Sequence, residues 1–274
     1  MNLTNLTSQI YYKPLAIVPE HYHSVNNLLT NLPQSLDLED LLDEVKPIFQ
    51  PMGNVDVINI SGLLLPKVSK LEAAFFGATG YNDIRQAIRQ AELSPSKHVI
   101  FNICSGGGSV KGMKETAKMI KRLAASKNVM AYSDDICASA AYYLANAAGR
   151  IYGSESAEFG SVGCFIAMIT EEKNLVENGF NPELIKAGKW KALGISIKDL
   201  SDEERQLLQD SVDAYYQDFK NFLSFRNIAD ENLQGQSFET LEAVNINMVD
   251  GVVDTLDGLI SVYSFSSQNN PFIP

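Results

Sequence analysis

The sequence predicts an α/β fold with a mostly parallel sheet and helical crossovers. Apolar stretches with the length and composition of buried strands alternate with stretches in which apolar residues recur at helical spacing. A strand, a helix and a second strand in succession usually form a parallel pair with the helix packed on one face of the sheet. A long amphipathic helix is expected towards the C-terminal end, over residues 201–226.

The core elements are expected between residues 55 and 152. The predicted strands are 55–60, 98–103, 128–132 and 150–152. The predicted helices are 81–91, 110–125 and 139–148. The stretch 63–80 shows no clear period and receives no assignment.

The predicted C-terminal helix has a recognisable beginning. Ser201 can cap the first turn, and Asp202, Glu203 and Glu204 place negative charge at the positive end of the helix dipole. Apolar and aromatic residues recur along the helix between Leu207 and Leu223. This face packs on its own domain by default, and the alternative is an interface with another subunit.

The chain is expected to have three parts. They are an N-terminal helical extension (1–50), a core domain (51–264) and a flexible tail (265–274). The extension contains a short apolar run at 14–19 and helical patterns at 21–31 and 36–45. Prolines and a glycine between residues 47 and 53 then interrupt the pattern, which indicates the boundary.

Composition limits the partners. The net charge is −11 and the isoelectric point is about 4.8, which argues against nucleic acid or an anionic membrane surface as the main partner. No run of 18 apolar residues occurs, so no membrane span is predicted. The polar N-terminus lacks the basic and then apolar pattern of a signal peptide, so a cytoplasmic location is expected.

The three cysteines predict neither a disulfide framework nor a zinc site. Cys104, Cys137 and Cys164 are odd in number, lie in apolar surroundings and lack CxxC spacing. We expect them to be buried free thiols, which fits a reducing compartment.

A glycine-rich segment, Ser105-Gly106-Gly107-Gly108-Ser109, follows the second predicted strand and precedes a helix. Consecutive glycines allow backbone N–H groups to approach a ligand, where they can stabilise an oxyanion or bind phosphate. The segment has neither GxGxxG spacing nor a Gly-Lys-Ser/Thr ending, which excludes the nucleotide-binding motifs. The structural alternative is a tight turn between strand and helix.

Two serines and a lysine complete the candidate site. Ser139 would begin a helix of small residues, where the next N–H can donate to an oxyanion; the alternative is a helix-capping serine. Ser161 lies in Gly160-Ser161-Val162-Gly163, which otherwise reads as a turn. Lys191 could act as a base if burial disfavoured its charge, although a surface lysine is the ordinary alternative and Lys189 is its close neighbour.

The order of these segments resembles the protease IV/signal peptide peptidase A family. The resemblance rests on segments 105–109, 138–145, 160–163 and 188–191 and extends from about residue 55 to 260. It implies a ClpP/crotonase-like fold and a catalytic Ser-Lys dyad within residues 51–264, with no metal or other cofactor.

Carried over to this sequence, the resemblance assigns Ser139 as nucleophile and Lys191 as general base. Ser161 matches the serine that orients the lysine, and Gly107, Gly108 and the Ala140 N–H match the oxyanion hole. Two departures exist. Gly106 stands where the family usually has proline, and Ala140-Ala141 replace a common Gly-Gly, although alanine donates the same backbone N–H.

The N-terminal segment narrows the resemblance to one branch. Residues 14–20 followed by a helix look like the opening of phage head-maturation proteases of the minor capsid protein C type, whereas a helical cap on the core is the structural alternative. This branch implies scaffold, portal or capsid proteins as substrates, a homo-oligomer, and work in the host cytoplasm or the prohead interior.

The implied mechanism is peptide-bond hydrolysis through an acyl-enzyme on Ser139. The substrate is expected to bind as an extended strand near the glycine-rich segment. The alternatives are a bacterial signal-peptide-peptidase-like protease, an inactive capsid- or scaffold-binding member of the family, and a crotonase-like acyl-CoA enzyme. The last would not require Ser139 together with Lys191.

Overall fold

A six-stranded sheet lies at the centre of the computed structural model, which describes residue 10 and residues 13–30 and 47–264. Across the sheet the strands are β13 (Gly251–Val252), β10 (Ile151–Gly153), β8 (Asn128–Ser133), β6 (His98–Cys104), β3 (Val55–Ser61) and β2 (Phe49–Met52). From β13 to β3 all neighbours are parallel, and β2 pairs antiparallel with β3. The predicted α/β fold with a mostly parallel sheet is therefore confirmed, and the four predicted core strands all lie in this sheet.

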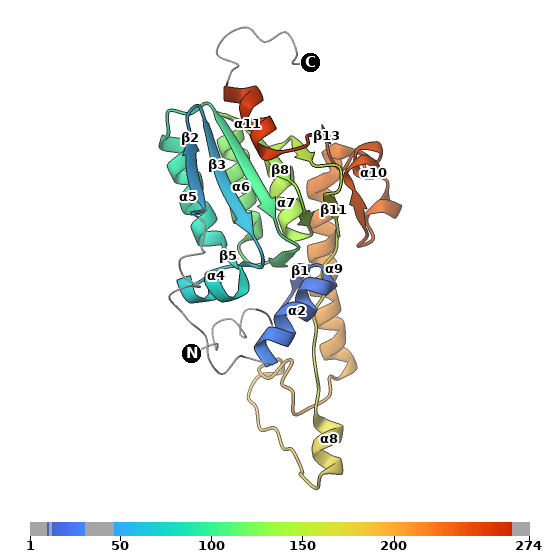
Figure 1. Ribbon diagram of the computed structural model, residues 1–274. Helices are drawn as coiled ribbons and strands as arrows, with labels where there is room; N and C mark the ends of the chain where they lie inside the picture. The colour runs from blue at the N-terminus through green and yellow to red at the C-terminus, as the bar shows by residue number, and fades with distance from the viewer. Residues whose placement is uncertain (1–9, 11–12, 31–46, 265–274) are drawn as a thin grey trace.

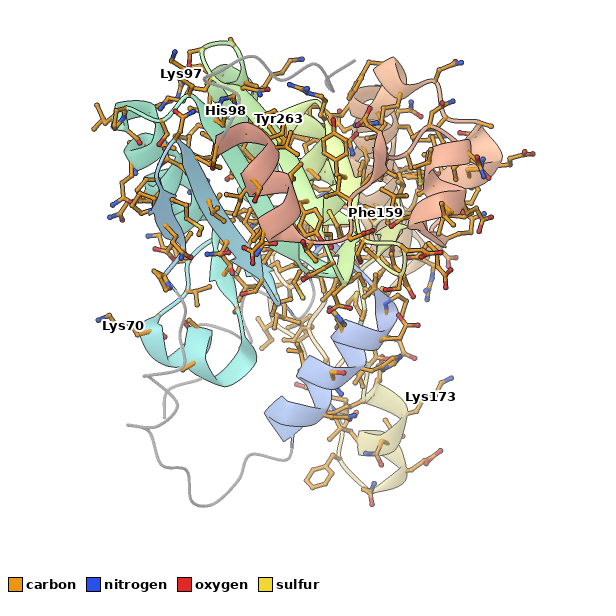
Figure 2. The ribbon with its side chains drawn as sticks, turned by 45° about the horizontal axis from the view of Figure 1, so that its top comes forward. Lys70, Lys97, His98, Phe159, Lys173 and Tyr263 are labelled. Carbon is orange, nitrogen blue, oxygen red and sulfur yellow. The ribbon has the colours of Figure 1, made fainter. Side chains whose placement is uncertain are left out.

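Helices cover both faces of the sheet (Figure 1). The crossover helices are α5 (Tyr81–Leu93), α6 (Met113–Ala124) and α7 (Ala140–Ala148), close to the predicted ranges. Their apolar residues form the main core with the side chains on one face of β3, β6 and β8. The opposite face is covered by α11 (Leu256–Ser264), whose Tyr263 lies against His98 with ring centroids 5.1 Å apart (Figure 2).

Two small sheets lie beside the central one. The first has the order β1 (Leu15–Ile17), β7 (Gly107–Ser109), β4 (Leu64–Leu65) and β5 (Thr79–Gly80). The second has the order β12 (Ser237–Glu239), β11 (Glu158–Gly160) and β9 (Ile136–Ala138). Strands β7, β9 and β11 each follow a strand of the central sheet along the chain, so the segments after those strands are placed side by side.

The remaining helices are short or peripheral. They are α2 (Pro19–Thr30), α4 (Lys70–Phe76), α8 (Glu172–Glu177), α10 (Thr240–Asn245), and the 3₁₀ helices η1 (Ser224–Arg226) and η2 (Asp230–Leu233). The helix predicted at 21–31 is confirmed by α2. The helical pattern at 36–45 and the tail 265–274 lie outside the described residues.

The long helix predicted over 201–226 is confirmed as α9 (Asp202–Leu223), followed by η1. Its start is a capping box, in which Ser201 and Glu204 each bond the backbone N–H of the other. Near its C-terminal end, Phe222 stacks on Tyr143 of α7 at 4.1 Å and Phe219 meets the same ring edge-on at 5.1 Å. This end of α9 therefore packs on its own domain.

Between β11 and α9 the chain leaves the body of the molecule as a long arm, residues 163–200, which carries α8 at its far end (Figure 1). None of the side chains in the arm is fully buried. The arm matters for function because it contains Lys191.

The cysteines agree only in part with the expectation of buried free thiols. All three cysteines are free; Cys137 is buried, whereas Cys104 and Cys164 are only partly so. Burial raises the pKa of Cys104 and of Cys164 to about 12, so both thiols stay protonated. None of the described helices is long and apolar enough to cross a membrane.

Candidate active site

Ser139 occupies a strained position at the start of α7. Its backbone dihedrals are φ 54° and ψ −121°, a region that a residue with a side chain rarely adopts. Its side chain makes no capping hydrogen bond to the helix, so the reading of Ser139 as an ordinary helix cap is wrong. A serine held in a strained turn between strand β9 and a helix has the geometry of a nucleophile elbow.

The surroundings of Ser139 hold it in this conformation. Its N–H donates to the carbonyl oxygen of Gly160 at 2.8 Å, and its carbonyl oxygen accepts from the Tyr143 N–H at 2.9 Å. Only 1% of the Ser139 surface is exposed. Ala140 is the first residue of α7, so its N–H has no partner within the helix and lies at the positive end of the helix dipole.

The glycine-rich segment lies next to Ser139 because Ser105 forms hydrogen bonds with β9 on one side and with Gly62 on the other. The Ser105 N–H donates to Ile136 at 2.7 Å, the Ala138 N–H donates to the Ser105 carbonyl at 3.0 Å, and the Ser105 hydroxyl donates to the Gly62 carbonyl at 2.6 Å. The segment continues as strand β7 and does not form the tight turn considered as an alternative.

Both central glycines are required by close backbone contacts. Gly107 has φ +100°, and a Cβ there would lie 2.2 Å from the Ala16 carbonyl oxygen, 2.9 Å from the Ala140 nitrogen and 3.0 Å from Ser139 Cβ. A Cβ on Gly108 would lie 2.0 Å from the Leu64 carbonyl oxygen. The glycine-rich segment, the helix N-terminus and the serine therefore meet at one point beside Gly107.

The predicted oxyanion donors differ in their present bonding. The Gly107 N–H donates to the Ser105 hydroxyl oxygen at 3.1 Å, so this donor is already engaged. Gly108 lies opposite Ala16 in the pairing of β7 with β1. The assignment of Gly107, Gly108 and Ala140 to an oxyanion hole stays a prediction.

Ser161 lies next to Ser139 across two parallel strands. The register of β9 and β11 pairs Ala138 with Gly160, which brings the following residues, Ser139 and Ser161, side by side. Ser161 also has a positive φ, 51°, and its N–H donates to the Gln236 carbonyl at 2.6 Å. The two candidate serines therefore lie side by side, and both have a strained backbone conformation with positive φ.

Lys191 lies apart from both serines in the structure of a single chain. It sits in a turn of the arm, where its N–H donates to the Gly188 carbonyl at 3.2 Å, and its side chain is exposed. No contact between Lys191 and Ser139 is found among the described residues. Its role as a base stays a prediction. That role requires an environment that buries the lysine and disfavours its charge, which the single chain does not provide.

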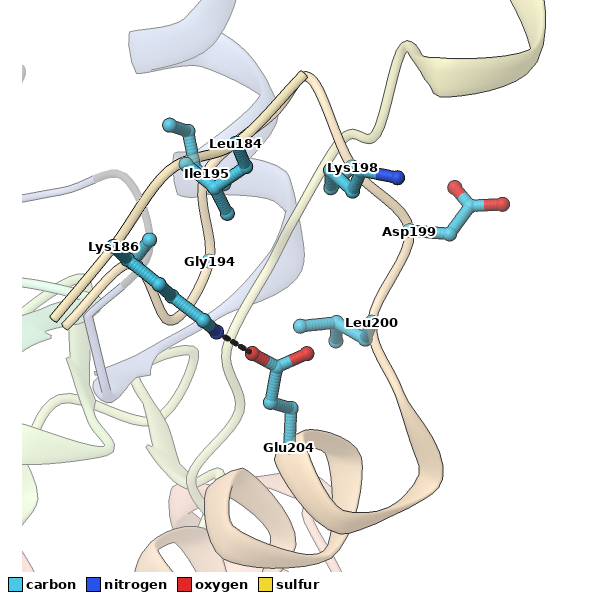
Figure 3. A pocket seen from close by; sticks show the side chains of 9 residues that line it. Leu184, Lys186, Gly194, Ile195, Lys198, Asp199, Leu200 and Glu204 are labelled. Carbon is cyan, nitrogen blue, oxygen red and sulfur yellow. Dashed lines mark ion pairs between the residues drawn. The ribbon is translucent and has the colours of Figure 1, made fainter. Parts of the chain in front are cut away.

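The neighbouring lysines of the arm are paired with the start of α9. Lys189 Nζ lies 2.8 Å from Glu203 and stacks over Trp190, and Lys186 Nζ lies 3.6 Å from Glu204. The Lys186–Glu204 pair borders a small cavity between the arm and α9 (Figure 3). In the described part of the chain Lys191 has no ion pair, which distinguishes it from both neighbours.

Strand β1, from the N-terminal part of the chain, lies beside the glycine-rich segment and Ser139. Strand β1 pairs antiparallel with β7, with Ala16 opposite Gly108 and Ile17 opposite Gly107. On its other side, Leu15 exchanges two backbone hydrogen bonds with Phe165, at 2.9 and 3.0 Å. The apolar run at 14–19 was the only sequence signal, and nothing in it indicated this partner.

Residues 121–262 match the model of peptidase family S49. The chain belongs to peptidase family S49. The matched range includes Ser139, Ser161 and Lys191, whereas the glycine-rich segment lies just before it. Membership of family S49 confirms the resemblance to protease IV/signal peptide peptidase A. It also agrees with the ClpP/crotonase-like fold that this resemblance implied.

Curated relatives of this S49 chain include two phage proteins. It is 28% identical over 216 residues to capsid assembly protease C of Escherichia phage lambda, covering 77% of this chain and 49% of that protein. It is 27% identical over 228 residues to the head-tail preconnector protein GP5 of Enterobacteria phage P21, covering 81% and 45%. The S49 chain thus spans about half the length of these relatives.

Among solved structures, the chain is similar to the 1510-N membrane-bound stomatin-specific protease. It has a TM-score of 0.47 and 14% sequence identity, with 77% of this chain and 85% of that chain covered.

Proposed function

We propose that this chain is a serine endopeptidase in which Ser139 is the nucleophile and Lys191 the general base. The observation that carries the proposal is the Ser139 elbow: a buried serine with strained backbone, not used as a cap, beside a glycine-rich strand and a helix N-terminus. Membership of family S49 supports the same reaction class.

In the proposed reaction neutral Lys191 removes the hydroxyl proton of Ser139, whose oxygen attacks the substrate carbonyl carbon. The carbonyl oxygen becomes an oxyanion, which the backbone N–H groups of Gly107, Gly108 and Ala140 would stabilise. The protonated lysine returns the proton to the leaving amine, and water then releases the acyl group from Ser139. Ser161 would orient the lysine.

The position of Lys191 supports action within a homo-oligomer. The arm exposes large apolar side chains, which favours its burial against another copy of the chain. These residues are Ile169, Val176, Phe180, Ile185 and Trp190. We propose that such packing buries Lys191 beside a Ser139 of the same assembly, which would both desolvate its ammonium group and complete the dyad.

The proposed substrates are phage structural proteins. Similarity to capsid assembly protease C and to the head-tail preconnector protein supports scaffold, portal or capsid proteins as the polypeptides that are cut. The corresponding place of action is the host cytoplasm or the prohead interior.

The test is co-expression of the chain with the scaffold or capsid protein encoded beside it, in wild-type and Ser139→Ala forms. Intact-mass analysis should find fragments that depend on Ser139. If both forms give the same masses and a fluorophosphonate probe labels neither, the chain is an inactive, structural member of the family. Unchanged thermal unfolding of Ser139→Ala serves as the control for folding.

A further inference from the structure

Strand β1 is paired along both edges, with β7 and with the backbone at Phe165, close to Ser139. We infer that Leu15–Ile17 fills the peptide groove of the active site as an intramolecular, substrate-like strand, and that it must leave before another polypeptide can be cut. This inference rests on the proposed peptidase function and adds to it a built-in competitor for the groove.

The pairing of β1 defines the groove. One wall is β7, the strand of the glycine-rich segment, and the other is the backbone at Phe165, which follows Ser161 along the chain. Leu15 bonds to Phe165, and Ala16 and Ile17 face β7 in antiparallel register. An extended peptide that adds a strand between two backbone edges binds in this way, through main-chain hydrogen bonds.

One carbonyl group of β1 lies close to the serine. A Cβ added to Gly107 would lie 2.2 Å from the Ala16 carbonyl oxygen, 2.9 Å from the Ala140 nitrogen and 3.0 Å from Ser139 Cβ. The Ala16 carbonyl oxygen therefore lies close to the Ala140 nitrogen and to Ser139. An outside peptide cannot place its own carbonyl there while β1 is bound.

Side-chain packing divides along β1 as it would for a bound strand. Ala16 packs into the main core with α7, where its small side chain is almost fully buried. Leu15 and Ile17 point the other way, into a small apolar cluster with Val25 of α2 and the partly buried Phe165. The strand is therefore fixed on both faces as well as along both edges.

A second, independent observation at Gly106 supports the inference. A Cβ at Gly106 would lie 2.3 Å from Nδ1 of His21 and 2.6 Å from Cγ2 of Val18. The Val18 N–H also donates to the Gly106 carbonyl at 2.9 Å. The family that this chain resembles usually has proline at this position. Glycine here leaves room for Val18 and His21, which follow β1, to pack against the glycine-rich segment.

The test compares two releasing variants with a control. Ala16→Pro removes a backbone N–H from the middle of β1, and Gly106→Ala forces a side chain against His21 and Val18. Val25→Ala is the matched control, because it weakens the same apolar cluster without touching the backbone pairing of β1. The readouts are the rate of Ser139 labelling by a fluorophosphonate probe and the rate of cleavage of a quenched fluorescent peptide.

We expect Ala16→Pro and Gly106→Ala to raise the labelling rate about tenfold or more, because the backbone bonds that hold β1 are lost. Val25→Ala should raise the rate less than either releasing variant, because it weakens the packing of β1 and leaves its backbone hydrogen bonds in place. A synthetic peptide with the sequence of residues 13–19 should compete with the fluorescent peptide in Ala16→Pro and have little effect on the wild type. Size-exclusion chromatography of each variant checks that the assembly is unchanged.

The outcomes separate this inference from the proposed function. Equal labelling and cleavage rates in the wild type, both releasing variants and the control would overturn the inference and leave the peptidase intact. Absence of labelling and cleavage in every form would instead refute the peptidase. Self-cleavage after Ala16 that disappears in Ser139→Ala would support the inference, because it requires β1 in the groove.

Discussion

The Ser139 N–H donates a 2.8 Å hydrogen bond to the carbonyl oxygen of Gly160, the residue immediately before Ser161. This bond continues the pairing of β9 with β11 by one residue beyond the strands. It holds Ser139 at a positive φ and keeps Ser161 beside it. The pairing of the small sheet thus helps to hold both serines in their strained backbone conformation.

Gly108→Ala should destabilise the protein and abolish cleavage. The added Cβ would lie 2.0 Å from the Leu64 carbonyl oxygen, and overpacking of this kind costs about 1–3 kcal/mol or more. Gly163→Ala is the control for stability, since a Cβ there meets nothing within 4 Å. Urea unfolding of both variants measures the difference, and equal midpoints would contradict the close approach of β7 to β4.

Lys191→Ala should abolish cleavage, whereas Lys189→Ala should retain most of it. Lys189 is engaged with Glu203 in an exposed ion pair, which is worth at most about 1 kcal/mol. The measurement is the initial rate on a fluorescent peptide, together with thermal unfolding of both variants. Full activity of Lys191→Ala would remove the lysine from the mechanism.

A mixture of Ser139→Ala and Lys191→Ala should regain part of the activity that each variant lacks. If the lysine of one copy serves the serine of another, some mixed assemblies contain one complete dyad. The experiment mixes the unfolded variants, refolds them together and compares the cleavage rate with each variant refolded alone. An inactive mixture of normal size would show that each chain supplies its own lysine.

Arg226→Ala should lower the free energy of unfolding by about 3 kcal/mol. The Arg226 side chain is only 5% exposed and binds Asn146, the Gly149 carbonyl and Asp250, which join η1 to the end of α7 and to β13. Arg122→Ala is the control. Its side chain is 67% exposed and lies 3.7 Å from Glu92, so its loss should cost under about 1 kcal/mol. Similar denaturation midpoints for the two variants would contradict this account.

His98 should make the protein less stable as the pH falls. Burial, with smaller contributions from Lys97 and Arg150, lowers the pKa of His98, which lies between Tyr263 and Asn128. The unfolded chain then binds a proton at higher pH than the folded one, so stability is complete above about pH 6.5, the ordinary histidine pKa, and declines below it.

The check is the free energy of unfolding between pH 7.5 and 5 for the wild type and His98→Gln. The wild type should lose more stability over this range than the variant. Parallel curves would assign the pH dependence to other groups.

The central sheet could be predicted because its strands are buried on both faces. The strands at 55–60, 98–103 and 128–132 are mostly apolar and rich in Val, Ile and aromatic residues, and such short runs carry their own signal. Strands β7, β9 and β11 have three residues each, too few to show a period. They exist because they continue along the sheet edge after the strands that precede them.

The amino-acid sequence determined the fold class and indicated the candidate catalytic residues, because both depend on local composition and order: apolar runs, consecutive glycines, and Ser139 before a helix of small residues. The tertiary structure alone decided how these parts meet. It placed Ser139 beside Ser161, left Lys191 on an exposed arm, and paired β1 with β7 on one edge and with Phe165 on the other. Those relationships join residues far apart in the chain through backbone hydrogen bonds, which any residue with an N–H and a carbonyl can form, and they therefore leave no signature in the sequence.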